Sequence, residues 1–218
     1  MAAPTVFFPY LSYLTGKDEG MEVNDLIDIH SGERKYLNRE ERQAFKEAAL
    51  FMEPHIRTFC LMIYYTGCRL GEALEITPDR LDFDGRRVLL RTLKQNRQNP
   101  DKVDRYRLIE LPNEYLASLE SAYKARSRKG TRSGKKRLWG FTDRTGQNYI
   151  KKVMNEAGIS GKKATSRGLR HSMGVMLALE KVPVNVIQDI LGHRFPESTQ
   201  IYMKILGDDR RKLIANIW

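Results

Sequence analysis

The sequence predicts a mostly helical α+β domain with a small antiparallel sheet, or hairpin, in its first half. Three observations favour this fold class. Apolar residues recur at helical spacing over most of the chain, two short segments read as strands, and turn residues separate the elements. With 218 residues, 41% of them hydrophobic and 30% charged, the chain can bury a core and does not have the composition of a disordered protein.

The helices are predicted from their ends as well as from their apolar faces. Asn38 and Glu41 form a capping-box pattern ahead of the first helix. Gly67 fits the end of the second helix, because glycine adopts left-handed backbone angles without strain. The helices are expected at 38–52, 54–66, 69–74, 113–126, 146–157, 166–181, 184–191, 197–204 and 208–217.

The sheet and the division of the chain follow from the remaining segments. Residues 87–94 and 105–111 read as two strands joined by a long polar tip. Residues 1–34 combine an apolar start with an acidic stretch and are interpreted as an N-terminal arm or linker. The rest, 35–218, is expected to form one domain that ends in an amphipathic helix over 208–218.

Composition limits the kinds of protein to consider. No stretch approaches ~20 consecutive apolar residues, so a membrane partner is not expected. The N-terminus lacks the pattern of a secretory signal, and Cys60 and Cys68 are the only cysteines. We therefore expect a cytoplasmic protein. No His/Cys/Asp cluster has metal-ligand spacing, so no metal and no cofactor are expected.

Positive charge is concentrated in one region of the chain. The formal net charge is +11, and the window 124–152 holds 11 basic residues against the single acid Asp143. Glycine and serine interrupt the basic run, which favours a mobile loop that follows a phosphate backbone over an ordinary solvated face. The predicted DNA-binding residues are Lys124, Arg126, Arg128, Lys129, Arg132, Lys135, Lys136 and Arg137.

Four polar residues stand at the ends of predicted helices or within apolar ones. They are Arg69, Arg170, His193 and Tyr202. Each has a structural interpretation: an arginine in an apolar helix is more often the buried partner of a carboxylate, and Glu72 could be that of Arg69. A histidine at a helix end is more often a dipole contact, and a lone tyrosine is usually core.

Taken together, the segments that hold these residues resemble the catalytic domain of the tyrosine recombinase, or phage integrase, family. TGCRLGEALEI (66–76) is similar to the family's T-G-x-R-x-x-E, and SRGLRH (166–171) to its H-x-L-R-H. LGH (191–193) and QIY (200–202) match its last two motifs, and RLIELP (107–112) matches a strand. The spacings agree as well, and the resemblance covers about 35–218.

The resemblance implies a catalytic role for six residues and a supporting one for Glu72. Tyr202 would be the nucleophile that forms a 3′-phosphotyrosyl bond with DNA. Arg69 and Arg170 would neutralise the transition state, His193 would donate to a phosphate oxygen, and Lys94 on the hairpin would protonate the leaving 5′-oxygen. The catalytic set is Tyr202, Arg69, Arg170, His193, Lys94 and Arg167.

Arg167 departs from the family pattern. It occupies the position of the first histidine of H-x-L-R-H, to which a proton-transfer role is commonly assigned. An arginine stays protonated and cannot fill that role, so Arg167 is expected to add electrostatic stabilisation instead.

The expected function is therefore that of a site-specific DNA recombinase, with double-stranded DNA as partner and no small-molecule substrate. The family also implies a tetramer on DNA, in which the helix 208–218 docks into a neighbouring protomer. Two alternatives remain open. One is a non-catalytic DNA-binding regulator with the same fold, and the other is a relaxing enzyme similar to type IB topoisomerases.

Overall fold

The structure is a computed structural model, and it describes residues 26–92 and 105–204. The helices are α1 (Arg39–Leu50), α2 (Pro54–Thr66), α3 (Leu70–Leu74), α4 (Asn113–Tyr123), α5 (Ala125–Arg128), α6 (Asp143–Glu156), α7 (Ser166–Leu179), α8 (Val184–Leu191) and α9 (Glu197–Lys204), with a 3-10 turn η3 (Pro78–Arg80). None of the helices in these two ranges is long and apolar enough to cross a membrane.

One antiparallel sheet accompanies the helices, in the order β1 (Leu81–Asp82), β2 (Arg87–Thr92) and β3 (Arg105–Glu110). β2 pairs with β3 over their full length, with Val88 opposite Ile109. Both of these side chains are buried, whereas Leu108 is half exposed, so one face of the sheet packs on the core. The sheet thereby confirms the mostly helical α+β fold class.

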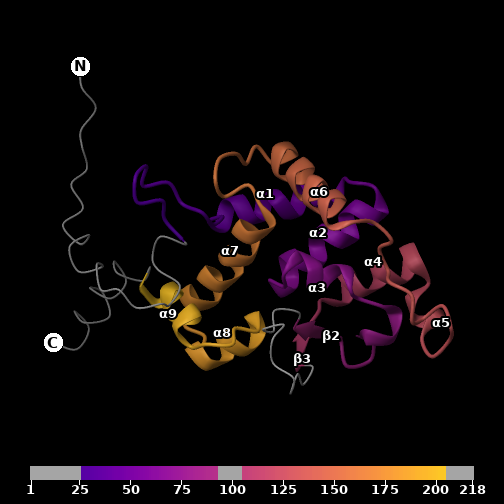
Figure 1. The fold of residues 1–218 in the computed structure, drawn as a ribbon. Coiled ribbons are helices and arrows are strands. Elements are labelled where there is room, and N and C mark those ends of the chain that lie inside the picture. The colour runs from indigo at the N-terminus through magenta and orange to yellow at the C-terminus, as the bar shows by residue number, and fades with distance from the viewer. Residues whose placement is uncertain (1–25, 93–104, 205–218) are drawn as a thin grey trace.

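The larger hydrophobic core lies between the sheet and the helices α1 to α4 and α6. Figure 1 shows α1 and α6 at the top of the molecule, β2 and β3 below, and α4 and α5 at the right. Within this core Trp139 packs edge-on against Phe59 and donates its indole N–H to Oγ1 of Thr58 over 3.1 Å. The indole is thus buried without an unsatisfied donor.

A second, smaller core lies among α7, α8 and α9. Its buried members include Val175, Leu191, Ile201 and Tyr202. Leu26 also belongs to it and is completely buried, although it precedes α1 by thirteen residues. The described part of the predicted arm therefore packs beside the C-terminal helices.

A buried arginine links α1 and α2 to α7. The guanidinium of Arg42, on α1, donates to Oγ of Ser172 on α7 over 2.8 Å and to the carbonyl of Tyr64 over 3.1 Å. It also lies 4.3 Å above the ring of Tyr64. These contacts hold the first turns of α7 against α1 and α2.

The helix ends agree with the predicted capping signals. Both halves of the capping box between Asn38 and Glu41 form, and Gly67 ends α2 with a left-handed φ of 60°. α6 begins three residues earlier than predicted, because the hydroxyl of Thr142 caps it. α4 ends three residues earlier, at Tyr123, because Lys124 takes a left-handed φ of 50°.

Two other expectations differ from the structure. The turn signals over 78–85 contain the short strand β1, which the sequence does not predict. The basic run is not an open loop over 124–137: it contains α5, and Lys129 donates to the carbonyl of Leu81 over 2.7 Å. Backbone carbonyls accept hydrogen bonds from the side chains of Arg128 and Lys129. The charge pattern of the sequence alone could not indicate these contacts.

Candidate active site

The first predicted arginine stands at the start of a short helix. Arg69 is the N-cap of α3, and its Nη1 donates to Oε1 of Glu72 over 2.8 Å. The backbone N–H of Arg69 donates to the other carboxylate oxygen over 3.0 Å. Glu72 is completely buried, whereas the side chain of Arg69 is 31% exposed. The carboxylate therefore orients a guanidinium that solvent or a ligand can still reach.

A second arginine binds the same carboxylate of Glu72. Arg107, on β3, places Nη2 2.5 Å from Oε2 of Glu72, and its Nε donates to the carbonyl of Ile190 over 3.0 Å. Its Nη1 donates to Oγ1 of Thr92 on β2. Burial alone would raise the pKa of Glu72, but the positive charges of Arg107 and Arg69 lower it below the usual glutamate value. Glu72 is therefore ionised at neutral pH.

Arg170 links two helix ends from within the core. Its Nη1 donates to the carbonyl of Gly67 over 2.8 Å, and its Nη2 donates to the carbonyl of Leu191 over 2.7 Å. These carbonyls close α2 and α8, so the cation meets the negative ends of two helix dipoles. Burial and the neighbouring charge of Arg69 lower the pKa of Arg170 to about 10, which still leaves it charged at neutral pH.

His193 has one ring nitrogen bound and one available. Gly192 ends α8 with a φ of 64°, and the histidine follows directly. Its Nδ1 lies 2.9 Å from Oγ1 of Thr199 on α9. Its Nε2 is buried and has no hydrogen-bond partner among the described residues. Burial and the charge of Arg170 lower the pKa of His193 to about 3, so the imidazole is neutral.

Tyr202 lies against the same histidine. Its ring stacks on the ring of His193, with the centroids 6.1 Å apart and the planes at 13°. The side chain is completely buried, and its ring packs on the Cα of Gly174, where a Cβ would collide with it. α7 thus needs glycine at position 174 to admit the tyrosine ring.

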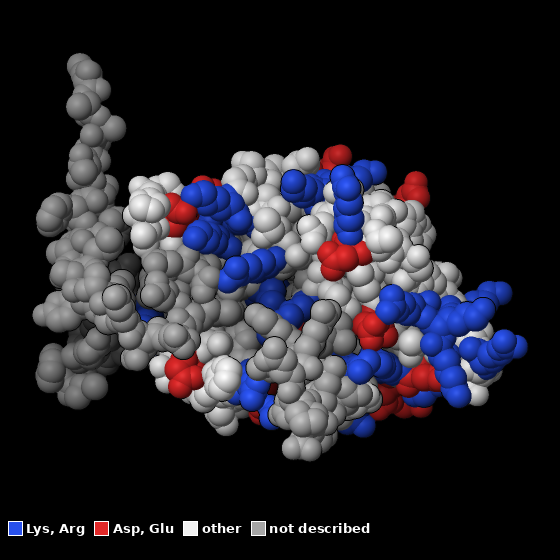
Figure 2. All heavy atoms as spheres, viewed as in Figure 1, with Lys and Arg blue, Asp and Glu red and all other residues white. Residues whose placement is uncertain are grey.

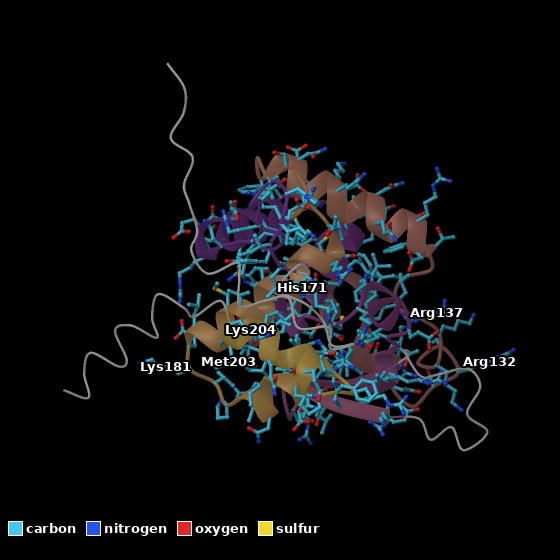
Figure 3. The ribbon with its side chains drawn as sticks, turned by 60° about the vertical axis from the view of Figure 1, so that its left-hand side comes forward. Arg132, Arg137, His171, Lys181, Met203 and Lys204 are labelled. Carbon is cyan, nitrogen blue, oxygen red and sulfur yellow. The ribbon has the colours of Figure 1, made fainter. Side chains whose placement is uncertain are left out.

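The tyrosine hydroxyl contacts the last histidine of the matched H-x-L-R-H segment, for which the sequence predicted no role. Oη of Tyr202 lies 3.0 Å from Nδ1 of His171, and Nε2 of His171 accepts a hydrogen bond from Nε of Arg167 over 3.1 Å. Arg167 and His171 lie on the same face of α7 because they are four positions apart, about one helical turn. Figure 3 shows His171 in the middle of the molecule, between α9 and the basic end.

The combined arrangement favours an anion. Arg69 and Arg107 bind the buried carboxylate of Glu72, and the charge of Arg170 acts on the same carboxylate. The buried Nε2 of the neutral His193 has no hydrogen-bond partner among the described residues. Fixed cations in a site with little water act strongly on a charge that develops there. A phosphate diester with its negative oxygens matches this excess of donors.

The predicted basic segment divides into two groups. Arg126 binds Asp84, Arg137 binds Glu75, and Lys129 and Arg128 donate to backbone carbonyls. Lys124 is the left-handed C-cap of α4. The second group is Arg132, Lys135 and Lys136, which are exposed. Within the described part of the chain, no residue forms a hydrogen bond or ion pair with their side chains. Figure 3 shows Arg132 and Arg137 together at one edge of the protein.

Some predictions fall on parts of the chain that the structure leaves undescribed. Lys94 and the helix 208–218 lie outside the described residues, so their roles stay predictions. Within 26–92 and 105–204, no three histidine, cysteine, aspartate or glutamate side chains are grouped so that they could hold a metal ion. His171 and Arg107 lie in segments matched to the family, but the sequence predicted no role in the site for either of them.

Comparisons with known proteins show which sequences resemble this chain. The model of the phage integrase family matches residues 35–207. A probable site-specific recombinase in the afa region of Escherichia coli is 32% identical over 180 residues, which are 77% of this chain and 71% of the relative. The type 1 fimbriae regulatory protein FimE of E. coli K12 is 27% identical over 172 residues, 74% of this chain and 81% of FimE.

Solved structures show the same fold. The XerH site-specific recombinase bound to a palindromic difH substrate has a TM-score of 0.67 and 23% identity. The XerA recombinase has a TM-score of 0.66 and 24% identity. The matched parts are 84% and 83% of this chain, but 53% of the XerH chain and 64% of the XerA chain. This chain therefore spans about half to two thirds of those proteins.

Proposed function

Because this chain belongs to the phage integrase family, we propose that it is a site-specific DNA recombinase that cleaves and rejoins DNA strands. The proposed intermediate is a 3′-phosphotyrosyl bond at Tyr202. The observation that carries the proposal is the meeting of Tyr202, His193 and Arg170, which come from separate segments of the sequence. A DNA-binding protein without catalysis would have no need of a nucleophile in this place.

The reaction begins with the tyrosine oxygen. Oη of Tyr202 gives up its proton and attacks the phosphorus of a DNA phosphodiester, and the bond from phosphorus to the 5′-oxygen breaks. The energy of the diester is retained in the new phosphotyrosyl bond. Attack by a free 5′-hydroxyl of another strand reverses the step and completes the exchange. Since the ring of Tyr202 is fully buried, DNA binding must displace groups that cover it.

The fixed cations would act on the transition state. Negative charge increases on the non-bridging oxygens as the phosphorus becomes five-coordinate. Arg69 and Arg170 would donate to these oxygens in fork geometry, each already oriented by its protein contacts. The unpaired Nε2 of His193, in its neutral N–H form, would donate a further hydrogen bond.

The leaving 5′-oxygen needs a proton, and we assign this role to Lys94. The described part of the hairpin supports this placement, since Arg107 on β3 binds Glu72 and thereby anchors the hairpin beside the arginines. In the sequence, Lys94 comes two residues after Thr92, the last residue of β2. General acid catalysis by a lysine requires this proximity.

The surface charge supports double-stranded DNA as the partner. Figure 2 shows lysine and arginine side chains along one face, at the end where α5 lies and in a recess near the middle. The exposed residues Arg132, Lys135 and Lys136 would contact phosphates at that end, and binding would weaken steeply as the salt concentration rises. The similar XerH recombinase was crystallised with a palindromic difH substrate, and the Tn1549 transposon integrase with transposon right end DNA.

We further propose that the protein acts in the cytoplasm as a tetramer on DNA. In the sequence, 208–218 forms an amphipathic pattern with Leu213, Ile214, Ile217 and Trp218 on the apolar side. This helix would dock into the neighbouring protomer. Deletion of residues 208–218 should impair pairing of two DNA sites more than binding to one, and unchanged pairing would refute the docking role.

A nicked DNA duplex tests the catalytic proposal directly. The nick lets the short 5′-ended fragment diffuse away after cleavage, so the covalent protein–DNA product accumulates on a denaturing gel. The band should form without divalent metal and vanish in Tyr202→Phe. Tyr106→Phe is the matched control, because Tyr106 lies half exposed on β3 and its ring faces the guanidinium of Arg80. DNA binding without any band would instead favour the non-catalytic regulator.

A sequence-preference measurement separates the recombinase from the topoisomerase-like alternative. A recombinase should form the band on one site and not on duplexes of scrambled sequence, and it should join strands from two duplexes. A relaxing enzyme would form it on most sequences and remove supercoils as a monomer. The family relatives named as recombinases favour the first result.

A further inference from the structure

The side chains next to the tyrosine hydroxyl suggest a role for Arg167 that differs from direct contact with DNA. We propose that Arg167 and His171 form a hydrogen-bonded pair that presents one N–H to Oη of Tyr202. In this arrangement His171 is the catalytic residue that contacts the reacting atom, and Arg167 is a positioning residue that acts through it. The inference rests on the proposed function of Tyr202 as nucleophile.

The geometry fixes which nitrogen of His171 has the proton. Arg167 Nε is 3.1 Å from His171 Nε2. A guanidinium has donors and no acceptor, so this ring nitrogen must accept and cannot also hold a proton. In a neutral imidazole the proton is then on Nδ1, which lies 3.0 Å from Oη of Tyr202. The tyrosine oxygen is therefore the acceptor of that bond.

Burial and the positive charges around His171 keep it neutral. Arg167 and Arg170 are on its own helix, Lys35 lies in the segment before α1, and His193 faces it from the loop after α8. Burial, followed by the charges of Arg167, Arg170 and Lys35, lowers the pKa of His171 to about 3. The imidazole thus has a single N–H over the whole physiological range. It cannot store the tyrosine proton, but it can stabilise the phenolate.

This pair gives the reaction a specific advantage. When Tyr202 loses its proton, the bond from Nδ1–H of His171 becomes a bond to a charged oxygen, which is stronger than a bond to a neutral hydroxyl. The hydrogen bond from His171 also holds Oη of Tyr202 in place, and a second lone pair of this oxygen attacks the phosphorus. Arg167 increases the effect because its cation polarises the imidazole toward Tyr202.

Which ring nitrogen of His171 is protonated can be measured without any DNA. In protein labelled with ¹⁵N at histidine, the Nδ1 of His171 should show the shift of a protonated nitrogen and Nε2 that of an acceptor, unchanged between pH 5 and 9. The His171→Asn variant assigns the signals by removing them. In Arg167→Met the population should move toward the Nε2–H form. Detection of the Nε2–H form in the unaltered protein would overturn the proposal, whether or not the protein cleaves DNA.

Two substitutions of His171 distinguish its role as a hydrogen-bond donor from its role in packing. His171→Asn can place its amide N–H near the position of Nδ1, whereas His171→Leu fills the space without a donor. The rate of covalent band formation by Tyr202 should fall about 10- to 100-fold in His171→Leu and considerably less in His171→Asn. Equal rates in the two variants, with equal unfolding midpoints, would contradict the donor role.

A double-mutant cycle tests whether Arg167 acts through His171. Arg167→Met should slow band formation in the unaltered background. In the His171→Leu background it should have almost no further effect, since the imidazole that it orients is gone. Independent, multiplying losses would show that Arg167 acts on the phosphate directly and would refute the relay. Because unaltered protein and Tyr202→Phe accompany every assay, failure of the relay and failure of the proposed function give different results.

Discussion

Nη2 of Arg107 lies 2.5 Å from Oε2 of Glu72, and both side chains are buried. The pair joins the sheet to α3, thirty-five residues earlier in the chain. The same carboxylate binds Arg69, so the predicted catalytic arginine and the hairpin strand share one counter-ion. A buried ion pair of this kind is costly to break from one side, because the remaining charge stays in the interior.

Glu72→Gln should therefore lower the free energy of unfolding by about 3–5 kcal/mol, since it leaves two guanidinium groups without their carboxylate. The measurement is the urea midpoint at pH 7. Glu180→Gln is the control, because its partner Arg39 and Glu180 are both more than half exposed and such pairs contribute less than about 1 kcal/mol. Equal effects of the two substitutions would contradict the role of Glu72.

The same pair predicts a dependence on pH. The folded pKa of Glu72 is lowered from its usual value of 4.5. A lowered pKa stabilises the folded state above the unfolded pKa, and this stabilisation is lost as the pH falls below about 4.5. The stability difference between the unaltered protein and Glu72→Gln should thus shrink between pH 5 and pH 3. A difference that stays constant over this range would refute the assignment.

The two catalytic arginines should differ in their effect on stability. Arg69→Ala and Arg170→Ala should each slow cleavage by about 10²–10³, because each removes a donor to the transition state. Arg170→Ala also leaves the buried carbonyls of Gly67 and Leu191 without a donor, at about 1–3 kcal/mol each. Single-turnover cleavage, DNA affinity and the melting temperature together check this, and near-normal cleavage by either variant would exclude that residue from catalysis.

Gly174→Ala should displace the nucleophile. A Cβ at this position would overlap the ring of Tyr202, and α7 cannot yield without disturbing His171. Band formation on the nicked duplex should be largely lost, together with a lower melting temperature. Gly140→Ala serves as the control, because nothing lies within 4 Å of its Cβ position and its φ is not positive. Full activity of Gly174→Ala would mean that the ring is not held in this place during catalysis.

The general acid can be tested through the leaving group. Lys94→Ala should cut the rate on ordinary DNA, because the 5′-oxygen then departs without a proton. Replacing that oxygen with sulfur should restore the rate, since a thiolate leaves without protonation. Tyr202→Phe gives no such rescue. If the sulfur substrate fails to restore Lys94→Ala, the lysine has another role.

Arg132, Lys135 and Lys136 should increase the affinity for DNA by contacting its phosphates. Replacing Arg132, Lys135 and Lys136 with glutamine should weaken DNA binding and reduce the slope of log affinity against log salt by about 3. Lys181→Gln, which removes a charge at the opposite side of the molecule in Figure 3, should leave that slope almost unchanged. Equal slopes for the triple variant and the unaltered protein would place the DNA elsewhere.

The sequence by itself determined the features that depend on neighbours in the chain. The capping box at Asn38, the stop at Gly67 and the pairing of Arg69 with Glu72 each involve residues no more than a few positions apart, where spacing decides the contact. The motifs around Arg170, His193 and Tyr202 carried the family resemblance for the same reason, because each is a short local pattern.

Only the tertiary structure decided which distant groups complete the site. Arg107 reaches Glu72 through the register of the sheet, and His171 meets Tyr202 because α9 packs on α7. Leu26 packs in the same small hydrophobic core as the tyrosine, although the sequence placed it in an arm. The hydrophobic burial that brings these elements together is non-directional, so spacing along the chain does not predict which polar groups it leaves in contact.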